Sequence, residues 1–365
     1  MYQMQAYPSS VEQIGSCIQI MQNAMVPRFS IICSMKDFYK MTLPGKLSEE
    51  FMEYSKALYP DNQLRRYRMH IKSSALYSQA VMDFDMEYMA TQKETNDLRC
   101  FCGAFGNRLC GASLSTVLNS IHQYFCRQYT YKNTGEVHDH SSASLLRTGG
   151  GVCQAIAVLA ATILQFTKYG GLNVTGEGFN GKSWGPHMWN AVKMDSGKWI
   201  FVDFTFGLNN ILSLPSTMTP ASEERFWQTH RYDKKAFSQE TLNKALKEAK
   251  KIGSAQLSLG INKGSFFING EQFSIDNGTP MLGKSDDGTF WIDLRSIVNM
   301  LGGSLERIPG RDILSMYVPN KTLRYYAKNS LAYLLNGQVF DVRILNQLRI
   351  PYYFDGSMFK LEFDH

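Results

Sequence analysis

The sequence lacks an apolar run long enough to cross a lipid bilayer. Its longest one, Ala155 to Phe166, is interrupted by Thr162 and Gln165, whereas a membrane-spanning helix needs about 20 apolar residues. The first residues, Met1 to Gln5, show no basic segment followed by an apolar one, so they do not resemble a secretion signal. We therefore expect no transmembrane segment and no leader in the sequence as written.

The sequence also lacks a large excess of charge of either sign. The chain has 38 basic and 32 acidic residues, which gives a formal net charge of only +6. No run of basic residues interleaved with aromatic ones occurs, so nucleic acid is not an expected partner. The lysine-rich segment 238–252 has glutamates at helical spacings from its lysines, which predicts a solvated helix face.

Cysteines are few, and their spacing does not match a structural zinc site. There are seven, and the odd number leaves at least one free thiol. Cys100, Cys102, Cys110 and Cys126 are close in sequence, but they do not form the two pairs, or the pair with spaced histidines, that zinc requires. Buried thiols with at most one disulfide are the favoured interpretation. We predict no metal site and no cofactor.

The length of 365 residues exceeds what one compact core usually holds and predicts two or three domains. Apolar spacing predicts helices over 11–25, 48–59, 113–129 and 238–252, and strands over 30–33, 80–88, 187–194 and 199–206. We interpret residues 1–95 as an N-terminal α+β region packed on the core, 96–237 as the core, 238–257 as a helical linker and 258–365 as a separate, smaller domain rich in short strands.

That last region contains a weak internal repeat. Residues 268–275 align with 335–342, and residues 287–294 align with 355–362. The first pair of segments contains Asn-Gly between apolar runs, which is the strongest short signal for a tight hairpin. Two copies of a hairpin-plus-strand unit are therefore expected, and the first copy carries an extra helix over 294–301.

Cys153 has the sequence setting of an activated nucleophile. It follows three glycines, and helical periodicity begins directly after it. A thiolate at a helix N-terminus is stabilised by unpaired backbone N–H groups and by the positive end of the helix dipole. We expect the glycines to let a substrate backbone approach closely. Gln154, through its backbone N–H, and Asn190 are the candidate residues for oxyanion binding and support of the site.

His187 and Asp203 are the candidate base and the group that orients it. They lie on two predicted strands joined by a turn. A three-residue loop with Gly197 at its left-handed position places Trp189 opposite Asp203. His187 then lies one diagonal step away on the same face of the sheet, about 7–8 Å between backbones and within side-chain reach. A two-residue loop would put the two side chains on opposite faces.

Each of these residues also has a structural interpretation. A cysteine before a helix is more often a small buried hydrophobe, and a histidine or aspartate on a strand often serves the fold alone. The combination of Cys153, His187 and Asp203 in this order favours nucleophile, base and orienting group. Trp184 and Trp189 are candidate walls of a substrate groove, with core packing as the alternative.

Three segments carry a family resemblance. Residues 149–155, 187–192 and 199–205 resemble the three signature segments of the transglutaminase-like superfamily, and the end of the preceding helix is similar to that family's usual lead-in. The resemblance implies an α+β, papain-like core in which the helix of the nucleophile packs on an antiparallel sheet. It assigns the same roles to the cysteine, the histidine and the aspartate. Phe204 departs from the proline that many members have at this position.

The C-terminal region resembles another domain, less specifically. Residues 263–365 are similar to the stalk-like domain at the N-terminus of copper amine oxidases, through their Asn-Gly hairpins and the segment Asp293–Arg295. Such domains do not hold copper, and this region has no His-x-His pattern, so no copper is expected. The resemblance implies a bacterial protein that is secreted or on the cell surface. We expect the C-terminal domain to bind cell-wall polymer, a partner protein or another copy of itself. A cytoplasmic maturation enzyme is the alternative.

The implied chemistry is acyl transfer through a thioacyl-enzyme. With water as acceptor the chain is a cysteine peptidase or amidase, and with an amine it is a transglutaminase that acts on protein glutamine. The resemblance to bacterial members favours hydrolysis of a protein or peptide. A surface binding or scaffold protein with a relic triad is the alternative from another class, and the presence of all three residues argues against it.

Overall fold

The computed structural model describes sixteen stretches of the chain: residues 4–8, 11–23, 25–42, 63–74, 79–208, 220–234, 237–251, 255–268, 270–275, 280–300, 304–308, 310–311, 313–318, 321–328, 332–333 and 339–363. The chain forms two compact units, each with its own hydrophobic core. The first contains Met1–Glu53, Leu64–Tyr88 and Ile252–His365, and the second contains Tyr54–Gln63 and Met89–Lys251. Among the described residues, no helix combines the length and the apolar character that a membrane crossing would need.

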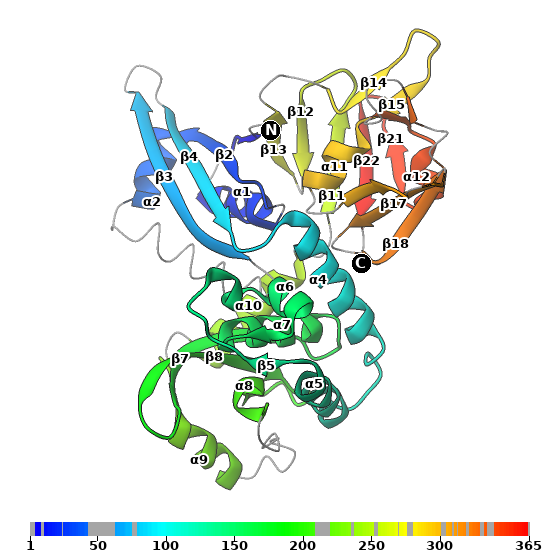
Figure 1. Cartoon of the computed structure of the whole chain (residues 1–365). Coiled ribbons are helices and arrows are strands. Elements are labelled where there is room, and N and C mark those ends of the chain that lie inside the picture. Colours follow the sequence, from blue (N-terminus) through cyan, green and yellow to red (C-terminus); the bar gives the residue numbers. More distant parts are fainter. Residues whose placement is uncertain are drawn as a thin grey trace. The chain divides into compact units, whose positions relative to one another are not determined.

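The first unit is built on a nine-stranded sheet (Figure 1). In spatial order its strands are β21 (Tyr352–Phe354), β22 (Met358–Phe363), β11 (Ala255–Gly260), β12 (Ser265–Ile268), β13 (Glu271–Ile275), β1 (Met4–Ala6), β2 (Arg28–Ser34), β4 (Gln79–Tyr88) and β3 (Leu64–Ser74). In the described residues, the N-terminal part also contains helices α1 (Val11–Asn23) and α2 (Met35–Thr42).

The predicted N-terminal region and the predicted C-terminal domain share this sheet. Strand β1 joins them, because it pairs in parallel with β2 and antiparallel with β13. The structure therefore groups most of residues 1–95 with the C-terminal residues, where the sequence suggested two separate regions. A hydrogen-bonded ladder between distant segments leaves no local pattern in either segment. The helix predicted over 48–59 lies outside the described residues.

Two smaller sheets complete the first unit. One contains β14 (Leu282–Lys284), β15 (Phe290–Ile292), β20 (Val339–Asp341) and β19 (Ala332–Tyr333), and the other contains β16 (Ser304–Arg307), β17 (Ile313–Val318) and β18 (Lys321–Lys328). Helix α11 (Leu294–Met300) occupies the predicted position, and α12 spans Ile344–Gln347. The hairpin β12–β13 turns at Gly270, whose φ is 85°. The counterpart turn at 334–338 lies outside the described residues, so the internal repeat stays a prediction.

The second unit contains an antiparallel four-stranded sheet in the order β10 (His230–Arg231), β7 (Gly171–Phe179), β8 (Trp184–Lys193) and β9 (Trp199–Val202). Helix α7 (Cys153–Gln165) packs on β7 and β8 (Figure 1). The other α-helices in the described part of the unit are α4 (Gln92–Asn107), α5 (Leu114–Gln128), α6 (Ser142–Thr148), α8 (Phe204–Gly207), α9 (Pro220–Thr229) and α10 (Gln239–Lys251). This arrangement confirms the α+β core with the nucleophile helix on an antiparallel sheet.

The register between β8 and β9 is the one that the sequence predicted. Asn190 pairs with Val202, the Met194 N–H donates to the Lys198 carbonyl at 2.8 Å, and Gly197 has a φ of 82°. One boundary was wrong, because β9 ends at Val202 instead of continuing to residue 206. The chain turns there because Asp203 caps the short helix α8.

Candidate active site

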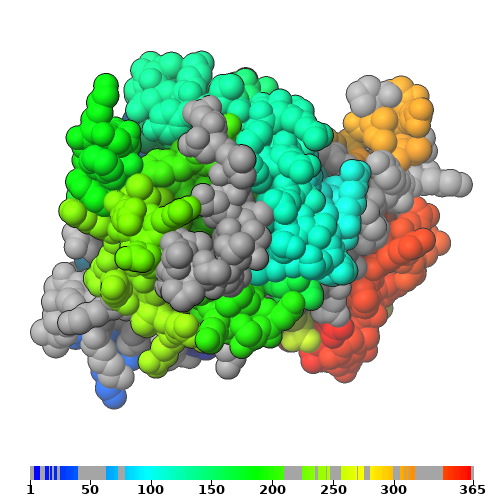
Figure 2. All heavy atoms as spheres, turned by 90° about the horizontal axis from the view of Figure 1, so that it is seen from below, coloured from blue at the N-terminus to red at the C-terminus, as the bar shows by residue number. Residues whose placement is uncertain are grey.

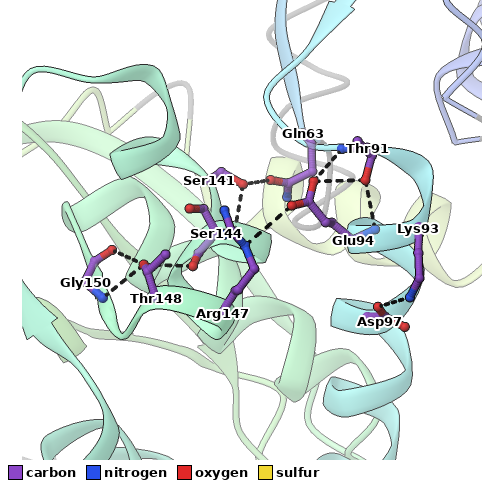
Figure 3. Close-up of polar contacts among 10 residues, drawn as sticks. All are labelled: Gln63, Thr91, Lys93, Glu94, Asp97, Ser141, Ser144, Arg147, Thr148 and Gly150. Atoms are coloured by element: carbon purple, nitrogen blue, oxygen red, sulfur yellow. Dashed lines mark hydrogen bonds and ion pairs between the residues drawn. The ribbon is translucent and has the colours of Figure 1, made fainter.

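The position of Cys153 at the start of α7 depends on the segment before it, helix α6, which is held by hydrogen bonds and an ion pair. Helix α6, just before it, is tied to the preceding part of the unit: Gln63 Oε1 accepts from the Ser141 hydroxyl at 2.8 Å, and Arg147 lies 3.6 Å from Glu94 (Figure 3). At the other end of α6, the Thr148 hydroxyl donates to the Ser144 carbonyl at 2.9 Å (Figure 3). These contacts fix where the chain leaves α6 and enters the nucleophile helix.

The three glycines before the nucleophile serve the chain's own packing. Gly149 ends α6 in the left-handed conformation, with a φ of 78°. Gly150 and Gly151 form a short buried strand, β6, that pairs in parallel with β5 (Thr130–Tyr131). A Cβ on Gly151 would lie 3.0 Å from the Asp139 carbonyl oxygen. This differs from the expected approach of a substrate backbone, because the neighbouring strand and the 137–140 turn already occupy that space.

Cys153 occupies the first position of α7 and is partly exposed. Val152, the N-cap residue, makes no side-chain cap hydrogen bond, and its own N–H donates to the Asp139 carbonyl at 2.9 Å. The first backbone N–H groups of a helix have no partner within the helix. Those of Cys153 and Gln154 therefore suit a thiolate or an oxyanion, as predicted.

His187 and Asp203 meet directly. The His187 Nε2 lies 2.7 Å from Asp203 Oδ2, and the two side chains are only 7% and 4% exposed. The other carboxylate oxygen accepts from the Thr205 and Phe206 N–H groups at 2.7 and 3.2 Å. Because Nε2 is engaged by the carboxylate, Nδ1 is the nitrogen left to exchange a proton with the thiol.

Two neighbours set the plane of the His187 ring. Phe206 stacks on it with ring centroids 4.7 Å apart and an angle of 22° between the planes. On β7, Gly178 lies so close that a Cβ there would be 2.8 Å from the imidazole Cγ and Cδ2. A larger residue at 178 would therefore push the ring off its present position.

The electrostatics of the pair favour an ionised Asp203 and a protonated His187. Burial alone would lower the pKa of His187 from 6.5, but its hydrogen bond to the Asp203 carboxylate and the neighbouring Cys153 thiol raise it to about 9. Burial alone would raise the pKa of the Asp203 carboxyl, but hydrogen bonds from His187 and His230 lower it to about 2. Such an imidazolium stabilises a thiolate beside it.

His230 is a site residue that the sequence analysis missed. It lies on β10, is 4% exposed, and its Nε2 lies 3.0 Å from the same Asp203 oxygen that contacts His187. His230 comes 27 residues after Asp203 and on a strand of two residues, so neither spacing nor periodicity marks it. The pairing of β10 with β7 brings His230 to the site; Figure 2 shows the lime part of the chain lying against the green part.

These same three residues form the one His, Cys, Asp and Glu group among the described residues that could hold a metal ion, with ligand atoms within 4.8 Å of one another. Their geometry is that of hydrogen bonds, because each histidine nitrogen faces the single oxygen Asp203 Oδ2 at 2.7 or 3.0 Å. A metal would need both nitrogens without their protons. The contacts are those of two N–H donors on one carboxylate.

Of the two predicted support residues, Asn190 is structural. Its side chain is fully buried, and Nδ2 donates to the Ala157 carbonyl of α7 at 2.9 Å and lies 3.2 Å from Asn173 Oδ1. It therefore ties β8 to the nucleophile helix and is not an oxyanion donor. The Gln154 side chain lies at the surface, where its Oε1 is 3.1 Å from His140 Nδ1.

The two tryptophans predicted to wall a groove have different positions. Trp189 is fully buried and contacts Phe226 and His230, so it belongs to the core. Trp184 is partly exposed, and the Arg231 guanidinium lies 3.9 Å from its ring centroid. Neither lines the cavity beside His187. The alternation of β8 did not reveal that β10 and α9 cover the Trp189 face.

A cavity of about 540 Å³ opens beside His187. Its lining residues are Tyr131, Gly178, Phe179, Asn180, Gly185, Pro186, His187, Thr205, Phe206 and Thr229. Apart from His187, none of these side chains carries a charge. The volume is in the range of pockets that hold a small molecule or a substrate side chain.

All seven cysteines are free thiols, so the cluster 100–126 holds no disulfide. Cys126 also has a histidine neighbour, since its Sγ lies 3.2 Å from His122 Nε2. That nitrogen lies 2.9 Å from the Gly207 carbonyl oxygen, which can only accept, so the nitrogen carries a hydrogen and is not a base. Burial raises the pKa of the Cys126 thiol. This second pair therefore lacks the properties of a nucleophile.

Gly178→Ala is expected to slow iodoacetamide alkylation of Cys153 at least about tenfold, because the new methyl group displaces the His187 ring. The rate constant is measured by peptide mass spectrometry. Gly185→Ala is the matched control: Gly185 faces Gly178 across the strands, and nothing lies within 4 Å of its Cβ position. Equal rates in both variants would show that the ring position does not matter.

The comparisons with known proteins agree with this geometry in part. Residues 110–204, which include Cys153, His187 and Asp203, match the family model of the transglutaminase-like superfamily. No curated protein matches the chain.

Two solved structures are similar at low identity. One is described as a TGase, with 13% identity, a TM-score of 0.27, and coverage of 55% of this chain and 59% of that one. Another is a "Putative Cysteine Protease from Cytophaga hutchinsonii", with 12% identity, a TM-score of 0.23, and coverage of 39% and 65%. The chain thus spans less than two thirds of either.

Proposed function

Because residues 110–204 form a transglutaminase-like core, we propose that the chain is a cysteine-dependent acyl-transfer enzyme that hydrolyses peptide or amide bonds. One observation carries the proposal. His187 is hydrogen-bonded to a buried, ionised Asp203 and lies close enough to Cys153, at the uncapped start of α7, for that thiol to raise its pKa. A thiolate, its base and the orienting carboxylate are then in one place.

The reaction follows from these roles. The Cys153 thiolate attacks the substrate carbonyl, and the oxyanion is stabilised by the first N–H groups of α7. His187 gives its proton to the leaving amine, and the product is a thioacyl-enzyme. His187 then takes a proton from water as water attacks the thioester, which releases the carboxylic acid and restores the thiolate–imidazolium pair. An amine in place of water would give the transglutaminase reaction.

The cavity beside His187 indicates the substrate class. Tyr131, Phe179 and Phe206 supply aromatic surface, and among the described lining residues only His187 can carry a charge that pairs with a charged substrate group. Burying an unpaired charge is costly. We therefore propose that the substrate residue in this cavity has an uncharged, apolar or aromatic side chain. From the resemblance of the C-terminal region, we also propose that residues 258–365 bind a cell-wall or protein ligand. The same resemblance is the basis for proposing that the protein is secreted.

The proposal is tested with activated esters of acetylated amino acids, which need no further recognition. We expect kcat/KM for the phenylalanine ester to exceed those for the aspartate and lysine esters at least about tenfold. Reaction in ¹⁸O-labelled water, with and without a primary amine, identifies the acceptor from the product mass. No acyl adduct on Cys153 with any ester would sink the proposal, and an amide as the main product would replace hydrolysis by transamidation.

A further inference from the structure

The second histidine at the active site is held from both sides. Its Nε2 lies 3.0 Å from Asp203 Oδ2, and its Nδ1 lies 3.1 Å from the Phe226 carbonyl oxygen. Asp203 is already the partner of His187, at 2.7 Å, so one carboxylate oxygen serves two imidazole rings. The acyl-transfer roles proposed above use only one of them.

The partners of His230 determine where its hydrogens are. A carbonyl oxygen and an ionised carboxylate can only accept, so both Nδ1 and Nε2 must donate. The Thr229 hydroxyl fits this pattern, because it lies 3.2 Å from the Phe226 carbonyl and can donate there. The neutral alternative requires the Thr229 hydroxyl to donate to Nδ1, 3.0 Å away. It would leave the lone pair of Nδ1 facing the Phe226 oxygen, which is unfavourable.

The packing also suits a positive ring. The Phe226 ring lies parallel to the His230 ring, with 3.9 Å between centroids and 9° between planes. A cation over an aromatic face is attracted by the quadrupole of that ring. His230 is 4% exposed, so water does not replace these contacts.

The charged surroundings of His230 are few among the described residues. Asp203 and His187 are the titratable groups that face it, from the end of β9 and from β8. Arg231, the next residue of β10, lies over the Trp184 ring, and Glu177, which pairs with it on β7, is exposed. On α9, Glu224 and Arg225 are also exposed.

We propose that His230 is a positioning residue: a protonated imidazole that shares the Asp203 carboxylate with His187 and limits how tightly that carboxylate holds the His187 proton. The two ring centroids are 5.6 Å apart, a distance at which one positive ring disfavours a second. His187 then releases its proton more readily to the leaving amine. The inference rests on the proposed function, since it concerns the same Cys153–His187 pair.

The experiment follows the inactivation of Cys153 by iodoacetate against pH. This anionic reagent is attracted while His187 is positive, so the rate falls as pH rises through the His187 pKa of about 9. His230→Gln keeps a donor to Asp203 but removes the charge. We expect the midpoint of the fall to move about one pH unit higher. His70→Gln, at an exposed position on β3, is the control and is expected to leave the midpoint unchanged.

The outcomes separate the two claims. If the His230→Gln enzyme is folded and its inactivation rate falls with the same pH midpoint as in the wild-type protein, the inference is overturned. The reactive Cys153 would still support the proposed function. A Cys153 that reacts no faster than Cys126 in the unchanged protein would overturn both.

A second measurement needs no variant at all. Histidine-specific ¹⁵N NMR is recorded at the pH where Cys153 reacts fastest, and the His230 ring is identified by its proximity to Phe226. We expect a proton on each of its two nitrogens. A single protonated nitrogen would contradict the proposal.

Discussion

Cys153→Ala is expected to lower hydrolysis of the phenylalanine ester by about 10⁴-fold or more, because no other group at the site can form the thioacyl intermediate. The ring of His187, the Asp203 carboxylate and the start of α7 stay in place without the sulfur, so substrate binding should change little. Initial rates and KM for the purified variant give both quantities.

Cys126→Ser is the matched control for that loss. It removes an exposed thiol with a histidine neighbour from the same unit. Its turnover should stay within about twofold of that of the wild-type enzyme, because the Cys126 Sγ contacts the Gly207 carbonyl and not the Asp203 carboxylate. Equal activity of the two variants would mean that the ester is hydrolysed elsewhere on the protein.

Asp203→Asn is expected to lower kcat by about 10³- to 10⁴-fold. The amide leaves His187 without its ionised partner, so the pKa of the ring falls from about 9: burial lowers it, and of the groups that raised it only Cys153 remains. The imidazolium is then lost at a lower pH, so the descending limb of the pH–rate profile moves to lower pH. The profile of kcat/KM measures this shift.

The same pKa shift affects folding. A raised pKa in the folded protein adds stability that is fully present below 6.5 and is lost as pH rises through about 9. The midpoint temperature of thermal unfolding of the wild-type protein should therefore fall as pH rises through that window. The midpoint temperature of Asp203→Asn should not show this fall. Asp195→Asn, at an exposed turn residue, is the control. An identical pH dependence for Asp203→Asn would contradict the assigned ion pair.

The position of Cys153 and the contact between His187 and Asp203 could be predicted because their signals are local. Cys153 is marked by the glycines and the helix that follows, and the pairing of His187 with Asp203 follows from a turn length and the two-residue period of strands. The same reasoning could not predict which faces of strand β8 are buried by other elements. It offered Trp189 and Asn190 as site residues, yet both are fully buried. Helix α7 packs on one face of β8, and on the other Trp189 contacts Phe226 of α9 and His230 of β10.

The sequence contained no pattern that marked the residues around the Cys153, His187 and Asp203 group. Strand β7 contains Gly176 and Gly178, which weaken its propensity for strand, and the reason for them is three-dimensional. A Cβ at 176 would lie 2.1 Å from the Arg231 carbonyl, and one at 178 would meet the His187 ring. His230 joins the site through the pairing of β10 with β7, which no nearby residue indicates. The pairing of β1 with β13 was not predicted for the same reason.

The central claim is that Cys153 is a thiolate held by His187. Its most direct test is the rate of iodoacetamide alkylation of each cysteine at about pH 6, where ordinary thiols are almost wholly protonated, for the unchanged protein and for His187→Gln. We predict that Cys153 reacts at least about 100-fold faster than Cys126, and that His187→Gln removes most of this advantage. A Cys153 that reacts at the rate of Cys126, or whose rate does not depend on His187, would contradict the account.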